Sequence, residues 1–283
     1  MNWTKARTTL IIAFLCLDIF LGIRVWGILQ TSPGSQSRLV EVKQAKEQLA
    51  QIGVQVLCEV PLQAVPSSLV MVKPLFREPE AAARALLGEV AGASVVNLGS
   101  ATVYKKGSIT MSVDKGSILE YLDRSIGGGL GDTKDDTAVA AVKQFMSDKG
   151  LTVSTSNFHV SRQGELAIVN AEQTVGRMPL FGTCIYAEVL GGKVRRFKLQ
   201  GLDVQGASGY RKALVPVSEA LQRAGREIVR MEGKGEIVSI EQGYFTEIYD
   251  ASQWEVVPAW RVKASSGLEL ILNGYTGELE SAK

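Results

Sequence analysis

The residue types that carry most enzymatic chemistry are sparse in this sequence. His159 is the single histidine, and it falls in a predicted strand, where a structural or exposed role is expected rather than general-base catalysis. There is no G-x-S-x-G, H-E-x-x-H, C-x-x-C or Walker motif, and the glycine run at 127–131 lacks the flanking residues of a phosphate loop. With 29 acidic residues a glycosidase-type carboxylate pair stays open, although none stands out. We therefore expect no enzymatic activity, no cofactor and no metal site.

Three cysteines limit the redox chemistry that the chain offers. Cys16 lies in an apolar N-terminal run, which leaves Cys58 and Cys184 far apart in the remainder. A disulfide between these two is one alternative. Two separate thiols are the commoner outcome when no framework of cysteines is present. The sequence leaves both alternatives open.

The first 30 residues predict a membrane anchor. Residues 8–29 are almost continuously apolar, interrupted by Asp18 and Arg24. As a helix this run would be about 33 Å long, enough to cross a hydrocarbon core of about 30 Å. Lys5 and Arg7 precede it, so the positive-inside rule places the N-terminus in the cytoplasm and the rest of the chain outside. A cleaved signal peptide is the competing interpretation, but no Ala-x-Ala-like site follows the run.

Asp18 is the unusual residue in this run. An ionisable side chain near the middle of a membrane costs ~2.5–3.5 kcal/mol on insertion scales, and Arg24 lies too far along the helix to pair with it. A polar residue one turn from a glycine, on an otherwise apolar face, is typical of a helix–helix contact in lipid. The alternative is that a protonated Asp18 is tolerated in a single anchor. The predicted contact face comprises Ile11, Phe14, Leu15, Asp18, Gly22 and Val25.

Composition and periodicity indicate that the rest of the chain is globular. Hydrophobic residues make up 46% and charged residues 21% of the sequence, and the net charge is +2, so neither disorder nor a nucleic-acid surface is expected. Apolar residues at helical spacing predict helices over residues 38–52, 78–89, 135–149 and 216–224. Strand-like segments occur at residues 101–104, 108–113, 118–121, 152–160, 165–174, 184–190, 194–199, 236–249, 255–263 and 268–273.

The order of these segments predicts the fold class. A helix followed by several strands indicates an antiparallel meander, in contrast to the strand–helix alternation of a parallel sheet. We predict an α+β fold: an N-terminal transmembrane helix plus extracytoplasmic domains of a helix followed by an antiparallel β-meander. The second α+β domain would contain a duplicated helix–meander unit. The predicted divisions are 1–30 (cytoplasmic start and transmembrane helix), 31–53 (linker and helix), 54–130 (first α+β domain) and 131–283 (second α+β domain).

Aromatic residues are denser near the C-terminus than elsewhere. Trp254 and Trp260 fall on one face of a single predicted strand, and Tyr275 follows. Packing of this face on the preceding helix is the favoured interpretation. The alternative is a ligand groove or a protein interface, in which Trp254, Trp260 and Tyr275 would be the contacting residues.

Both ends of the sequence resemble one family. Residues 2–8 (NWTKART) and 14–21 (FLCLDIFL) at the start, and 258–262 (PAWRV) and 273–278 (NGYTGE) at the end, are similar to YycI-type proteins of Gram-positive bacteria. Between the ends, the order of elements alone matches. The resemblance implies a single-span auxiliary protein of the WalK/WalR (YycG/YycF) two-component system, which governs cell-wall metabolism. It also implies that the transmembrane helix contacts the sensor kinase, and that the external α+β repeats have no known catalysis.

Together these features predict a membrane-anchored auxiliary regulator of a WalK/YycG-type sensor histidine kinase, with restraint of the kinase as the expected direction. Its expected partners are that kinase and a YycH-like protein in the membrane, and Asp18 and Gly22 belong to the contact face. Its expected location is the cell membrane, with a single span, a cytoplasmic N-terminus and an extracellular C-terminal domain. The alternative function is an extracytoplasmic binding module for a cell-wall fragment or peptide.

Overall fold

The computed structural model describes residues 35–76, 78–114, 118–128, 133–249 and 251–283, together with Phe14, Leu17, Asp18 and Phe20. In this part of the chain there are four helices and sixteen strands, and all strand pairs except β1–β13 and β9–β13 are antiparallel. The predicted α+β class is therefore confirmed. The predicted transmembrane helix lies for the most part outside the described residues.

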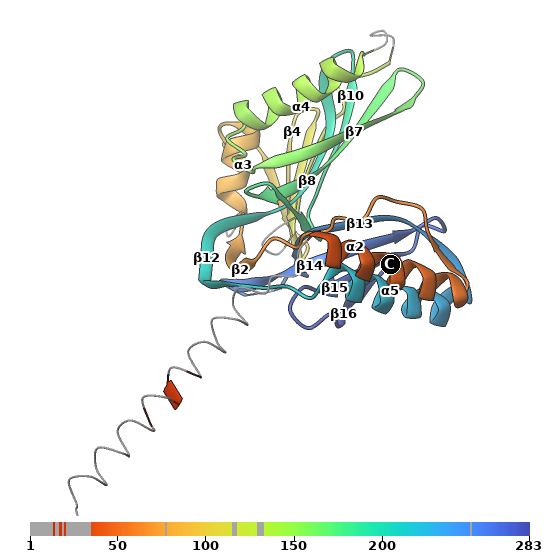
Figure 1. Cartoon of the computed structure of the whole chain (residues 1–283). Coiled ribbons are helices and arrows are strands. Elements are labelled where there is room, and N and C mark those ends of the chain that lie inside the picture. The colour runs from red at the N-terminus through yellow and green to blue at the C-terminus, as the bar shows by residue number, and fades with distance from the viewer. Residues whose placement is uncertain are drawn as a thin grey trace, which may run out of the picture.

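The upper part of the molecule in Figure 1 is an antiparallel sheet with two helices on one face. One half contains α3 (Pro79–Leu87) and the strands β3 (Ser94–Asn97), β4 (Ala101–Lys106), β5 (Ile109–Asp114) and β6 (Ile118–Asp123). The other half contains α4 (Asp135–Asp148) and the strands β7 (Thr155–Gln163), β8 (Leu166–Val175), β10 (Cys184–Leu190) and β11 (Lys193–Gln200). The halves join through β6 and β11, which gives the strand order β3-β4-β5-β6-β11-β10-β8-β7. We call this the upper sheet.

The lower part carries the other two helices, α2 (Ser35–Gln51) and α5 (Val217–Glu232), which lie side by side (Figure 1). They pack on β1 (Val54–Val56), β13 (Gly235–Phe245), β14 (Trp254–Ala264) and β15 (Glu269–Asn273), and β16 (Leu279–Ala282) pairs with β15. β2 (Ser67–Pro74) and β12 (Leu202–Lys212) extend this lower sheet beyond β14. β9 (Met178–Phe181) joins the two sheets, because it pairs with β8 and with β13.

The chain passes three times through a helix and then a four-stranded meander. These units are α3 with β3–β6, α4 with β7, β8, β10 and β11, and α5 with β13–β16. The predicted helix–meander order is thus present. Strand pairing continues across residue 130, where the sequence suggested a domain division: β6 pairs with β11, and β2 pairs with β12 and β14. Segments from both sides of that position therefore build each sheet.

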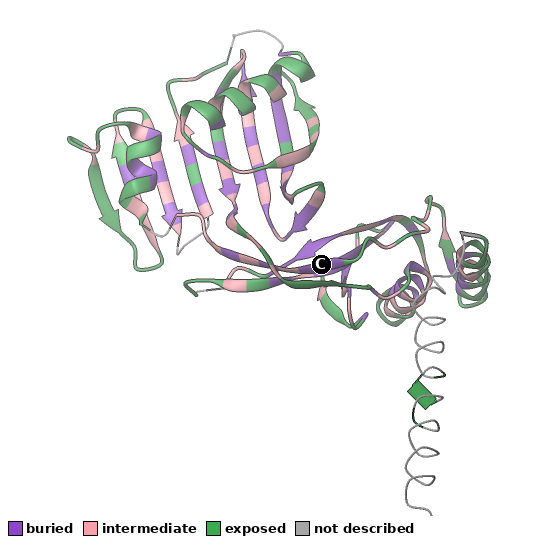
Figure 2. Cartoon of the chain, turned by 60° about the vertical axis from the view of Figure 1, so that its left-hand side comes forward, coloured by how far each residue is buried: buried purple, intermediate pink, exposed green. Residues whose placement is uncertain are grey.

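Each sheet has its own hydrophobic core under its pair of helices. The upper core includes Met111, Leu119 and Phe197, packed against α3 and α4, and Figure 2 shows both helices on the same face of the upper sheet. The lower core is built around Trp260, which packs with residues of α2 and α5 such as Leu49. These two cores lie between each sheet and its pair of helices, so they do not include the side chains on the opposite face of each sheet.

α5 is longer than predicted, because it continues to Glu232 rather than ending near residue 224. A glycine inside a helical pattern is a common sign of a helix end. Here Gly225 instead lets α2 approach, since a Cβ at this position would lie 2.1 Å from Cδ2 of Leu49. The helix ends where Gly233 adopts a positive φ of 78°.

Gly243 of β13 provides a test of how closely β9 packs on the lower sheet. A Cβ at this position would lie 2.5 Å from both Cζ of Phe181 and the carbonyl oxygen of Pro179. Overpacking of this kind costs about 1–3 kcal/mol, so we expect Gly243→Ala to lower the free energy of unfolding by roughly 2 kcal/mol in urea denaturation. Gly127→Ala is the control, because a Cβ there meets nothing within 4 Å. Equal effects of the two substitutions would contradict the close packing.

Candidate functional site

The predicted membrane contact face falls largely outside the described residues. Phe14 and Asp18 are described; both are helical and exposed. Ile11, Leu15, Gly22 and Val25 lie outside the described residues. Within the part of the chain that the structure describes, no helix is both long and apolar enough to cross a membrane.

The three C-terminal aromatics do not form a common site. Trp260 is fully buried in the lower core, and its Nε1 donates a hydrogen bond to the carbonyl oxygen of Val215 at 3.2 Å. Trp254 lies in another cluster and donates to Oγ1 of Thr246 at 2.8 Å. The hydroxyl of Tyr275 donates to the carbonyl oxygen of Ser67 at 2.8 Å. Packing therefore accounts for Trp260, and the suggestion that it contacts a ligand is corrected, because helix α5 covers its face of the sheet.

Charged side chains instead gather where the two sheets meet. Arg261 of β14 is almost fully buried, and its guanidinium forms a bidentate pair with Glu172 of β8, through Nη1 and Oε1 and through Nη2 and Oε2, the latter at 2.8 Å. Its Nε and Nη2 also donate to Oε1 of Glu241 on β13, at 2.9 and 2.6 Å. The guanidinium carbon lies 4.2 Å from the ring centroid of Phe181. One buried cation thus joins the upper sheet, the lower sheet and β9.

The two carboxylates keep Arg261 charged despite its burial. Burial by itself acts to lower the pKa of the guanidinium, but the hydrogen bonds and the charge of Glu172, with those of Glu241, outweigh it and hold the pKa above its usual value. Such bidentate pairing is typical of arginine with a carboxylate, and lysine cannot form it. The cluster is therefore a fixed electrostatic link between the sheets.

A cavity of about 600 Å³ lies beside Arg261. We call it the junction cavity. It is lined by polar side chains from both sheets, among them Asn157, His159 and Asn170 of the upper sheet and Ser239 and Lys263 of the lower sheet. The cavity can therefore offer hydrogen-bond donors and acceptors to a polar ligand.

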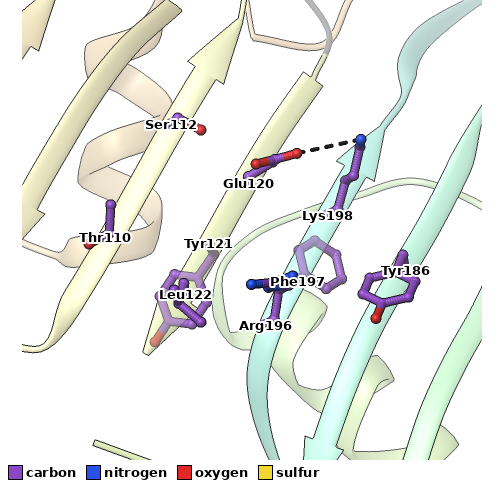
Figure 3. Close-up of a pocket in the computed structure, with 9 residues that line it drawn as sticks. All are labelled: Thr110, Ser112, Glu120, Tyr121, Leu122, Tyr186, Arg196, Phe197 and Lys198. Atoms are coloured by element: carbon purple, nitrogen blue, oxygen red, sulfur yellow. Dashed lines mark ion pairs between the residues drawn. The ribbon is translucent and has the colours of Figure 1, made fainter. Parts of the chain in front are cut away.

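A second cavity lies on the upper sheet, on the face opposite α3 and α4, and measures about 450 Å³. Figure 3 shows its lining residues from β5, β6, β10 and β11, with Tyr186, Arg196 and Lys198 beside one another. Nζ of Lys198 lies 3.4 Å from Oε1 of Glu120, and Nη1 of Arg196 lies 3.5 Å from Oε1 of Glu188. Tyr186 donates its hydroxyl hydrogen to Oε1 of Glu188 at 3.0 Å. We call this face, with its alternating charges, the open face.

Of the residues that could act in nucleophilic or acid–base chemistry, His159 and Cys184 line the junction cavity, whereas Cys58 packs against the lower core. His159 is exposed on β7, as the sequence suggested for a structural or exposed histidine. Cys58 and Cys184 are both free thiols, and burial raises the pKa of each. A nucleophilic cysteine needs a lowered pKa. Among the described residues no group of three or more His, Cys, Asp or Glu side chains could hold a metal ion.

The thiol of Cys184 gives a direct chemical test of this environment. Because burial raises its pKa, we expect its rate of alkylation by iodoacetamide to reach half-maximum at a higher pH than that of an ordinary cysteine. The measurement uses the full chain carrying Cys16→Ser and Cys58→Ser. Unfolding in guanidinium should restore the ordinary midpoint. A folded-state midpoint below that of the unfolded chain would contradict the assignment and would indicate an activated thiolate.

Sequence patterns alone could not have identified these residues. Glu172, Glu241 and Arg261 come from three strands, and they meet because β9 brings the sheets together. Arg261 stands between Trp260 and Val262 in a strand otherwise rich in apolar residues. A charge inside an apolar strand was the available signal, because such a residue needs a partner when it is buried.

Comparison with known proteins supports the fold but identifies no family or function. No family model matches the chain, and no curated protein matches it. Thirteen chains of solved structures match. One of them, an uncharacterized protein from Eubacterium rectale ATCC 33656, has a TM-score of 0.56 and 9% sequence identity, and the match covers 82% of this chain and 91% of that one. At this identity the likeness concerns the fold alone.

Proposed function

We propose that this chain is a membrane-anchored auxiliary regulator that modulates a WalK/YycG-type sensor histidine kinase through contacts of its transmembrane helix. The expected effect is to restrain the kinase. The observation that carries the proposal is Asp18 in the middle of the apolar run at residues 8–29. An acidic side chain at that depth costs ~2.5–3.5 kcal/mol unless a neighbour satisfies it. A second membrane helix can supply that neighbour, since polar groups hydrogen-bond across helices in lipid.

Two further features support this function. The resemblance of both ends of the sequence to YycI-type proteins implies the kinase and a YycH-like protein as membrane partners. The charge pattern around the apolar run favours a cytoplasmic N-terminus and an extracellular body at the cell membrane. On this proposal the folded part acts without catalysis.

A bacterial two-hybrid assay tests the helix contact. We expect residues 1–30, fused to the reporter half, to associate with the kinase, and Asp18→Leu to reduce the signal severalfold, because a satisfied polar contact is lost. Thr9→Leu is the matched control, since it also removes a polar group but lies about two and a half turns away, on the opposite face of a regular helix. Association that survives both Asp18→Leu and replacement of the whole run by an unrelated apolar span would refute the proposal.

A second function, an extracytoplasmic binding module for a cell-wall fragment or peptide, is favoured by the two cavities that adjoin the uncovered side of the upper sheet. It predicts that muropeptides raise the melting temperature of the full chain. Tyr186→Ala should reduce that shift, because Tyr186 lines the open-face cavity. Trp260 is unsuited to this test because it is buried. The absence of any shift across muropeptides and wall polymers would count against this function.

A further inference from the structure

We infer that the junction cavity binds an uncharged glycan through side chains of both sheets. The inference deepens the second proposed function, external binding, and rests on it; regulation of the kinase through the helix is independent of it. Four features of the described residues support it: the place of the cavity between two uncovered sheet faces, a β-bulge that adds a side chain to its lining, the balance of its charges, and its unpaired polar side chains.

The junction cavity lies between the two sheet faces that the helices leave uncovered. On β8, Asn170 and Glu172 alternate with residues of the upper core, so they project from the face opposite α3 and α4. On β14, Arg261 and Lys263 alternate in the same way with residues of the lower core. The volume of about 600 Å³ is typical of small-molecule sites, which range over about 300–1,000 Å³. A ligand can therefore reach these side chains without displacing a helix.

A β-bulge in β7 adds Asn157 to the lining of the cavity. The register between β7 and β8 shifts between Ser156 and His159, so two residues of β7 lie opposite Ala171 alone. In a regular pairing the residue after Ser156 would lie opposite Ala171 and face the helices. Instead Asn157 has a φ of 54°, a conformation that asparagine adopts more readily than most residues, and it lines the cavity with His159. Bulges that re-aim a side chain in this way are common beside functional sites.

The charged side chains that line the cavity balance one another. Arg261 donates four hydrogen bonds to Glu172 and Glu241. Nζ of Lys263 lies 3.1 Å from Oε2 of Glu269. An anionic ligand would have to compete with these carboxylates, and a cationic ligand would have to compete with the two basic side chains. Because a charge that leaves water without a partner costs far more than a neutral polar group, the cavity favours an uncharged ligand.

Four polar side chains of the cavity have no hydrogen-bond partner among the described residues: Asn157, His159, Asn170 and Ser239. The amides, the hydroxyl and a neutral imidazole can each donate and accept. The hydroxyl groups of a ligand also do both, and a sugar ring carries several of them close together. The acetamido group of an N-acetylated sugar adds one donor and one acceptor that match a side-chain amide. The unpaired groups therefore fit a glycan.

The position of the cavity on sheet faces favours a glycan over an extended peptide. Proteins commonly bind extended peptides through main-chain hydrogen bonds at an exposed strand edge. Of the strands that line the cavity, β8, β10, β13 and β14 each have a neighbouring strand on both sides. Most of the cavity can therefore offer side-chain groups alone. In a wall fragment the glycan supplies hydroxyl and acetamido groups, whereas the peptide brings charged groups.

Fluorescence anisotropy tests the inference with the full chain in a zwitterionic detergent, which has no sugar head group. The probe is a tetramer of N-acetylglucosamine with an uncharged fluorophore, and the comparison is a peptide of sequence Ala-Glu-Lys-Ala-Ala with the same label. We expect the sugar to bind and the peptide not to bind. Asn157→Gly combined with Asn170→Ala should weaken binding roughly tenfold, because hydrogen bonds from two amides are lost. Glycine keeps the positive φ at residue 157 accessible.

Ser239→Ala is the second variant, and it should weaken binding severalfold because the lower sheet also contributes to the cavity. Asn97→Ala is the matched control, since Asn97 is also an exposed strand asparagine of the upper sheet but lies on β3, outside the cavity. Thermal melting followed by circular dichroism checks that each variant is folded.

Three results would each overturn the inference: no binding of the sugar at about 10 mM, equal affinity for the peptide, or a double variant that binds no more weakly than Asn97→Ala. If muropeptides still raised the melting temperature in that case, external binding would stand while the glycan site would be excluded. If they did not, the second proposed function would fail as well.

Discussion

Replacing Trp260 by alanine is expected to lower the free energy of unfolding by about 3–5 kcal/mol, the range found when a large aromatic side chain is removed from a core. Trp260 is fully buried between the lower sheet and α5. Its loss would leave a cavity and would remove the hydrogen bond from Nε1 to the carbonyl oxygen of Val215. Chemical denaturation followed by circular dichroism measures the change.

Tyr249→Ala is the control for this prediction. Tyr249 is another aromatic residue of the C-terminal part, but it is 50% exposed, and its ring contacts that of Trp254 edge to face. We expect it to cost less than about 1.5 kcal/mol, the upper value of an aromatic pair. If Trp260→Ala proved as mild as Tyr249→Ala, the packing of α5 on this strand would be contradicted.

Arg261→Ala is expected to cost about 3 kcal/mol, the lower end of the range for removing one partner of a buried ion pair. The substitution leaves Glu172 and Glu241 close together without their cation. Their side chains are 26% and 31% exposed, so water can reach them and limits the loss. Because the cluster links the sheets, faster amide exchange should appear in β8 and β13 together.

Arg261→Lys separates charge from geometry at this position. Lysine keeps the positive charge but cannot form the bidentate pair with Glu172, so an intermediate loss is expected. Arg162→Ala serves as a comparison, since its ion pair with Asp135 is more exposed; exposed pairs are worth about 0–1 kcal/mol. A loss for Arg261→Ala as small as that for Arg162→Ala would show that the cluster does not hold the sheets together.

Local patterns predicted most of the regular structure. The segment at 184–190 matches β10, and the helix expected at 135–149 matches α4, because both have clear periodicity and end at glycines. β2 and β12 were not predicted. β12 contains Gly206 and Gly209 at positive φ, and apolar and polar residues alternate only weakly along it. Its strand conformation therefore depends on pairing with β2. Tertiary pairing of this kind overrides local propensity.

The candidate sites depended even more on long-range contacts. The sequence placed Trp254 and Trp260 on one face of a strand, but it could not show that α5 covers Trp260 while Trp254 joins a different cluster. The open face was also beyond prediction, because it is built from two meanders that meet where β6 pairs with β11. Single strands reveal alternation, whereas the register between distant strands decides which charges become neighbours.

A transcriptional reporter of kinase output tests most directly the proposed regulation of a sensor kinase by the membrane helix of this chain. Cells would carry the full chain, residues 1–30 alone, or the full chain with Asp18→Leu or Thr9→Leu. We predict that the full chain and Thr9→Leu lower the output, that residues 1–30 retain much of this effect, and that Asp18→Leu loses it. An output that Asp18→Leu lowers as strongly as the unaltered chain does would contradict the claim.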